Sequence, residues 1–187
     1  ISVHHRPDFE EIMDTAMDAF NDFMQNGKID PNLDGLELPD VPLWAIWDIH
    51  QYAKDAGNQE AIKRYGKLVK DLLQFIIDQK HPTLHLADNG LVTTDGTKVP
   101  MTWMDSSRPD GTPIIPRSGY IVEFNALWYN ALKFAQNLFA DDVASIDQVK
   151  TWEEITDKAK DAFINTFLNE SGYLYDYVDG YYSDPSV

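Results

Sequence analysis

Cysteine is absent from the 187-residue sequence, and cationic residues are scarce in it. Without cysteine the chain has no disulfide framework, no thiolate metal site and no thiol nucleophile, although this absence leaves the cellular compartment undecided. Only 15 Lys and Arg stand against 31 Asp and Glu, so the formal net charge is -16. Because this charge repels phosphate backbones and anionic lipid surfaces, we exclude nucleic acid and membranes as partners.

Several other common signals are missing as well. No apolar run approaches the roughly 20 residues that cross a bilayer. The sequence has no Gly-rich phosphate loop, nucleophile elbow or calcium loop. His81 and His85 have a metal-like spacing, but Pro82 between them disfavours the helix that would bring both to one ion. We therefore predict no metal and no cofactor.

The residues that are present favour a packed, helical protein. Hydrophobic residues make up 43% of the chain, enough for the core of one domain. Hydrophobic periodicity predicts an all-α fold with helices over residues 7–26, 41–56, 59–79, 120–140 and 151–169. Thr151 and Glu154 form a capping box, which we expect to mark the start of the last helix.

The predicted helices are of two kinds. Those at 41–56 and 120–140 are apolar on almost all sides, which indicates inner elements, whereas the other three have one apolar face. This alternation of inner and outer helices is typical of a two-layer ring of helix hairpins, although five helices do not close such a ring. Between residues 84 and 95 the segment "LHLADNGLVTTD" predicts a small β-hairpin around Asn89 and Gly90.

The sharpest candidate for chemistry is Asp105, in the segment "TWMDSSRP". Trp103 and Met104 bracket it with apolar surface, a setting that keeps a carboxyl group protonated and suits it to donating a proton. The alternative is a loop aspartate that accepts local backbone N–H groups. The residues of this loop leave both interpretations open.

Two further carboxylates stand in unusual surroundings. Glu123 lies in the apolar helix at 120–140, so it must be paired, protonated or next to a wet pocket, and Arg117 is a candidate partner. Asp40 by itself is typical of a helix N-cap. The nearby Trp44 and Trp47, however, offer flat apolar surfaces near it, which suit a neutral polar ligand with an apolar face.

The same residues carry a family resemblance. "TWMDS" followed by "PRSGYIVEFNALWYNALKFA" resembles the signature of the amylo-α-1,6-glucosidase domain of glycogen debranching enzymes. The segments "DVPLW" and "YLYDYVDG" are similar to two more stretches of that family, so the likeness runs from about residue 40 to the end. It implies an α/α toroid of six helix hairpins, an α-glucan or glycogen oligosaccharide as partner, and a cytoplasmic location. It also implies hydrolysis of α-1,6-linked glucose at branch stubs, with inversion.

The resemblance assigns roles to individual residues. It implies that Asp105 is the general acid and that the sugar subsite is formed by Asp40, Trp44, Trp103, Arg117, Glu123, Asn125, Trp128 and Tyr129. Ser106 departs from the family, which commonly has alanine there. The chain also stops short of the family segment that continues the toroid and supplies the general base, a glutamate. We therefore expect residues 1–187 to be a single partial domain, inactive alone and completed by the rest of its catalytic domain.

Two alternatives remain at the level of the sequence. One is another α/α-toroid glycosidase, similar to glucoamylase, trehalase or an oligosaccharide-trimming glucosidase, because these enzymes also place an acid in a loop after a tryptophan. The other is a non-catalytic sugar-binding domain that has kept the aromatic pocket.

Overall fold

The computed structural model of the protein describes residues 7–26, 38–102 and 105–180. These residues form mainly helices: α1 (Pro7–Asn26), α2 (Val41–Ala56), α3 (Asn58–Ile77), α4 (Val122–Leu138) and α5 (Ile146–Phe167). Four short strands accompany them: β1 (His85–Leu86), β2 (Val92–Thr93), β3 (Tyr120–Ile121) and β4 (Tyr177–Val178). The predicted helical character is confirmed. The toroid stays a prediction.

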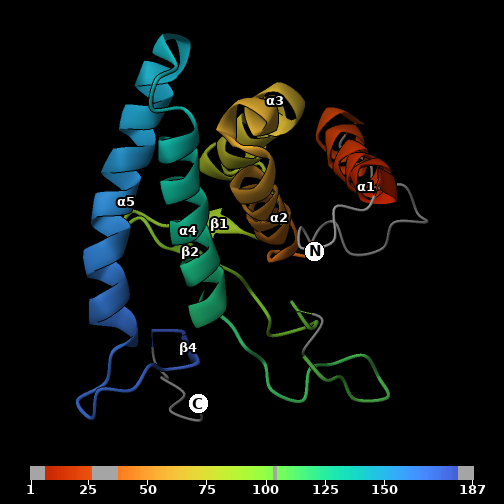
Figure 1. The fold of residues 1–187 in the computed structure, drawn as a ribbon. Helices are drawn as coiled ribbons and strands as arrows, with labels where there is room; N and C mark the ends of the chain where they lie inside the picture. The colour runs from red at the N-terminus through yellow and green to blue at the C-terminus, as the bar shows by residue number, and fades with distance from the viewer. Residues whose placement is uncertain (1–6, 27–37, 103–104, 181–187) are drawn as a thin grey trace.

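Helix α4 is the centre of the assembly. It packs against α5 on one side and against α2 and α3 on the other, while α1 lies beyond α3 (Figure 1). Phe124, Trp128 and Leu132 recur every four residues along α4 and are fully buried, as expected for a helix with neighbours on several sides. The two helices predicted as inner elements, α2 and α4, are thus neighbours in one core.

The outer helices use one apolar face. In α3, Tyr65, Leu72 and Ile76 are buried, whereas Lys63 and Lys67 are exposed. The buried stripe follows the three- and four-residue spacing of the sequence, so hydrophobic burial fixes the rotation of the helix. No helix in the described part of the chain is both long and apolar enough to cross a membrane.

The start of α5 differs from the prediction. The helix begins at Ile146, after a 3-10 turn η2 (Val143–Ser145), and not at Thr151. Asp142 caps that turn, because its side chain accepts the N–H of Ala144. The Thr151 hydroxyl donates to the carbonyl of Asp147 at 3.0 Å, a bond within the helix. The predicted capping box is therefore wrong. The helical segment begins earlier, at the turn that Asp142 caps.

The start of α4 also differs from the prediction. Tyr120 and Ile121 belong to the strand β3, which pairs antiparallel with β4. Sequence periodicity around residue 120 does not reveal this pairing, because β4 follows α5 and comes from a distant part of the chain. The loop that precedes α4 is consequently tied to the segment that follows α5.

The predicted hairpin is confirmed. β1 and β2 pair antiparallel. The N–H of Gly90 donates to the carbonyl of Ala87 and the N–H of Ala87 to the carbonyl of Leu91. Gly90 has a φ of 85°, so Asn89 and Gly90 are the last two residues of a three-residue loop with a glycine bulge. Trp128 holds this loop against α4 by donating from Nε1 to the Gly90 carbonyl at 3.0 Å.

Candidate active site

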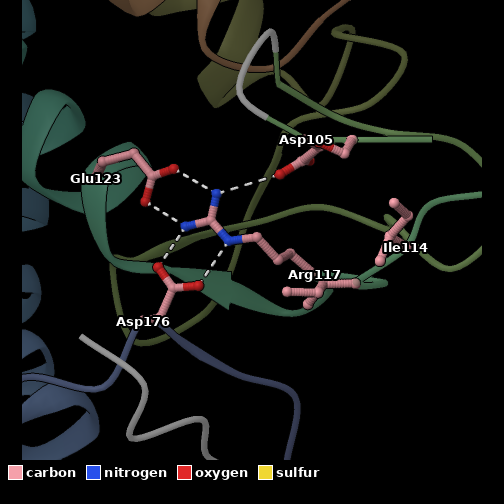
Figure 2. A pocket seen from close by; sticks show the side chains of 7 residues that line it. Asp105, Ile114, Arg117, Glu123 and Asp176 are labelled. Carbon is pink, nitrogen blue, oxygen red and sulfur yellow. Dashed lines mark hydrogen bonds and ion pairs between the residues drawn. The ribbon is translucent and has the colours of Figure 1, made fainter.

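A pocket of about 480 Å³ lies where three segments meet, the last of them distant from the other two in the sequence. They are the loop from Asp105 to Arg117, the first turn of α4 and the residues just before β4 (Figure 2). Its lining residues are Asp105, Ser106, Ile114, Ile115, Arg117, Glu123 and Asp176. Three carboxylates thus surround one guanidinium group, and two isoleucines form the apolar wall.

Arg117 is the centre of this cluster. It meets Glu123 in a two-bond pair, with Nη1–Oε1 and Nη2–Oε2 distances of 2.7 Å each. A second two-bond pair joins it to Asp176, at 2.9 Å from Nε and 2.7 Å from Nη2. Burial alone would lower the pKa of Arg117, but the hydrogen bonds and charges of these two carboxylates raise it. The arginine therefore stays a fixed cation, and Glu123 has the partner that its position in the sequence predicted.

Asp105 has a different environment from the other two acids. Its Oδ2 accepts the backbone N–H groups of Met101 at 3.1 Å and Thr102 at 3.2 Å. Its Oδ1 lies 3.6 Å from Nη1 of Arg117, an ion-pair distance that is too long for a good hydrogen bond (Figure 2). Asp105 thus has the local N–H bonds expected of an ordinary loop aspartate, and it also lines the pocket. The predicted apolar bracket, Trp103 and Met104, lies outside the described residues.

The loop that carries the isoleucine wall is held by its own hydrogen bonds. The N–H of Ile114 donates to the carbonyl of Ser106 at 2.8 Å. Arg108 donates from Nη2 to the Ile114 carbonyl at 3.3 Å, and its Nη1 donates to the carbonyl of Pro113. Ile114 and Ile115 remain about half exposed. The wall is thus formed by a turn whose internal hydrogen bonds hold the two apolar side chains that line the pocket.

Asp40 is buried next to the cluster without lining the pocket. It precedes α2, but its side chain makes no capping hydrogen bond, and its Oδ1 has no hydrogen-bond partner among the described residues. The pKa of Asp40 is raised, mainly by burial, and the charges of Glu123 and Asp105 add to this effect. Trp44, one turn further along, is 40% exposed and meets Trp47 edge-on. The buried carboxyl group of Asp40 thus lies next to an exposed indole.

The other predicted sugar contacts do not line the pocket. Asn125 is 1% exposed, and its amide is used within the protein: Oδ1 accepts the N–H of Val92, and Nδ2 donates to the carbonyls of Val92 and Ile121. Trp128 is buried against the hairpin. Tyr129 packs against the small cluster of Leu91, Ala159 and Phe167. These three residues support the elements around the pocket. Trp103 lies outside the described residues.

Asp176 is the charged residue of the pocket that sequence reasoning did not single out. The segment "YLYDYVDG" was set apart only by its resemblance to the family. Its aspartate sits among tyrosines after a helix, and nothing local indicates a contact with Arg117, 59 residues earlier. The resemblance of this segment to the family is the one signal in the sequence that points to Asp176, and it does not indicate that Asp176 pairs with Arg117.

The two histidines with metal-like spacing have separate surroundings. Nδ1 of the buried His81 accepts the N–H groups of Thr83 and Leu84, whereas His85 is exposed in β1. Across residues 7–26, 38–102 and 105–180, no group of three potential metal-binding side chains gathers. His81 thus has a structural role in the turn after α3.

The fold and the site together define a class: a helical protein with an acidic pocket organised around one arginine, suited to a neutral polar ligand. The model of the amylo-α-1,6-glucosidase family matches residues 11–187. The chain therefore belongs to that family, a glycosidase-related family of glycogen debranching. Neither the curated proteins nor the solved structures contained a significant match to the chain.

Proposed function

We propose that the protein hydrolyses α-1,6-linked glucose at the branch stubs of glycogen-type glucans, with inversion, and that Asp105 is the general acid. The supporting observation is the difference among the pocket carboxylates. Glu123 and Asp176 each give both oxygens to Arg117, whereas Asp105 keeps Oδ1 outside such a pair. Asp105 is therefore the pocket acid best placed to give a proton to a bound ligand.

In this mechanism Asp105 Oδ1 gives its proton to the glycosidic oxygen as the bond from C1 of the glucose to that oxygen breaks. A water molecule attacks C1 from the opposite face, and a second carboxylate takes the proton of the water. The products are a glucose of inverted configuration and a linear chain with a free 6-hydroxyl group.

The base has to be a carboxylate other than Glu123 and Asp176, because Arg117 already holds both oxygens of each. An inverting enzyme needs its two carboxyl groups about 6.5–9.5 Å apart, with room for water between them. We propose that this base is a glutamate further along the protein, as the family resemblance implies. The helices described above would then be part of an α/α toroid in which α2 and α4 are adjacent inner helices.

Binding of the terminal glucose would use the polar groups next to the pocket. Trp44, which is 40% exposed, offers an indole face for the apolar side of the ring, and the carboxyl group of Asp40 lies buried beside that indole. Ile114 and Ile115 would contact the glucan chain that leaves the pocket. A neutral α-glucan suits this site, because an anionic ligand would meet the surplus of carboxylates.

The test is glucose release from a phosphorylase-limit dextrin, with trehalose as the competing substrate. We expect the intact protein that carries this chain to release β-glucose first from the dextrin and to leave trehalose unchanged. Asp105→Asn should remove the activity, whereas the matched control Asp88→Asn, at an exposed position of the hairpin turn, should keep it. Hydrolysis of trehalose would favour another toroid glycosidase, and glucan binding without turnover would favour a non-catalytic domain.

A further inference from the structure

Asp176 and Glu123 together occupy most of the hydrogen-bond donors of Arg117. A guanidinium group has five N–H groups. Nε donates to Asp176, Nη2 donates to both Asp176 and Glu123, and Nη1 donates to Glu123. Among the described residues, one N–H is left without a hydrogen-bond partner, and it is on Nη1, the atom that lies 3.6 Å from Asp105 Oδ1. The two carboxylates therefore decide which way the last donor points.

The main chain of Asp176 is fixed to the helix that carries Glu123. Its carbonyl accepts the N–H of Val122 at 3.0 Å, and the next two residues form β4, which pairs with β3. Arg117 itself lies three residues before β3. Both carboxylates that hold the guanidinium thus stand on one hydrogen-bonded unit, and Asp176 approaches Arg117 from the side opposite to Asp105 (Figure 2).

We propose that Asp176 is a positioning residue, which holds the Arg117 guanidinium so that its one unshared N–H points toward Asp105 Oδ1 and the pocket. This inference rests on the proposed function and deepens it. When a glucoside enters, the unshared N–H donates either to Asp105 or to an oxygen of the sugar. Loss of Asp176 releases Nε and one N–H of Nη2, so the guanidinium can turn and the last donor loses its direction.

Asp176 also contributes one negative charge to the surroundings of Asp105. The charged groups that face Asp105 are Arg117 from its own loop, Glu123 from α4, Asp176 from the segment before β4, and Asp40 from the segment before α2. Arg108, in the same loop, turns its guanidinium to backbone carbonyls. Removing the charge of Asp176 leaves Arg117 less neutralised, so the surroundings of Asp105 become more positive.

The first experiment measures position and does not depend on activity. Crystal structures of the intact protein and of its Asp176→Asn variant give the orientation of Arg117. We expect the variant to lose the bond from Nε and to move Nη1 away from Asp105 Oδ1, and Asp176→Glu to restore part of the orientation. An unmoved guanidinium in Asp176→Asn would overturn the proposal even if the protein hydrolyses glucosides.

The second experiment measures kinetics on the limit dextrin. Asp176→Asn should lower kcat/KM by about 100-fold, with most of the loss in kcat, and should change the pH profile of the reaction. Asp176→Glu should regain part of the rate, and the exposed control Asp161→Asn should stay within about twofold of the wild type. Circular dichroism checks that each variant is folded.

The two proposals fail in different ways. A wild-type protein that releases no glucose contradicts the proposed function, and the crystal structures still decide the role of Asp176. An active wild type whose Asp176→Asn variant is equally active and has the same pH profile overturns the positioning role alone.

Discussion

The backbone of Gly96 lies directly against the carbonyl group of Arg117: a Cβ atom at Gly96 would stand 1.8 Å from that oxygen. Both residues belong to loops, and the two loops could not approach each other so closely if position 96 carried a larger residue. The loop that presents Arg117 to the pocket is therefore shaped by a glycine 21 positions earlier in the sequence.

We predict that Gly96→Ala displaces the Arg117 loop. The clash is with backbone, so the loop must move, and the variant should lose about 1–3 kcal/mol of stability and most of its affinity for glucose. Urea denaturation and glucose titration measure the two effects. Gly66→Ala is the matched control, because its Cβ would make ordinary contacts in α3 and should raise stability slightly. Normal glucose binding by Gly96→Ala would contradict the account.

We predict that Asp105→Asn separates substrates by their need for a proton. Branch-stub hydrolysis should fall by about 10²–10⁴-fold, because the leaving alcohol needs general-acid assistance. Action on α-glucosyl fluoride should be largely spared, because fluoride leaves with little proton transfer. Initial rates on both substrates give the answer. An equal loss on the fluoride would mean that Asp105 does more than donate a proton.

The stability of the protein should fall below pH 6.5 partly because of His81. Burial, with a smaller effect of the His85 charge, lowers the pKa of His81 from 6.5 to about 4. Between these values the unfolded chain binds a proton that the folded protein does not, so folding stability decreases as the pH falls. The full contribution is about 3 kcal/mol, present above pH 6.5 and lost by about pH 4.

His81→Asn tests this contribution. Asparagine can still accept the N–H groups of Thr83 and Leu84, but it does not titrate in this range. In urea denaturation from pH 7 to pH 4, the unfolding free energy of the wild type should therefore fall by more than that of the variant. Two curves that remain parallel would show that His81 does not cause the loss.

Asn125→Ala should destabilise the protein more than it harms sugar binding. Its amide satisfies the N–H and carbonyl of Val92 and the carbonyl of Ile121, and each buried group left without a partner costs about 1–3 kcal/mol. Asn130→Ala, at a half-buried position of the same helix, should cost less. A variant of normal stability that no longer binds glucose would instead make Asn125 a sugar contact.

The sequence predicts the helices well because each one buries a stripe of its own residues. α2, at Val41–Ala56, matches the predicted range, and Gly57 ends it by donating its N–H to the Ala53 carbonyl. The predicted start of α5 is misplaced because a local pattern was misleading. Thr151 and Glu154 fit a capping box, but the helical turn already begins at η2, which Asp142 caps. Local patterns compete, and only the packed chain decides between them.

The site is predictable only in part. Arg117 and Glu123 are six residues apart, so their pairing can be inferred from the sequence. Asp176 joins them through the pairing of β3 with β4, two strands of two residues each. Such short strands carry no periodicity. A contact formed by them follows from the tertiary packing of α4 and α5, which residue patterns alone do not give.

This long connection has a consequence for the order of folding. Asp176 reaches Arg117 across 59 residues, and the intervening chain includes both α4 and α5, so we expect the cluster to close after these helices have formed and docked. The pocket is then completed late, and it is the first part to be lost when the docking weakens. Substitutions in the interface between α4 and α5, far from the carboxylates of the pocket, should abolish ligand binding at temperatures where the circular dichroism signal of the helices is still intact.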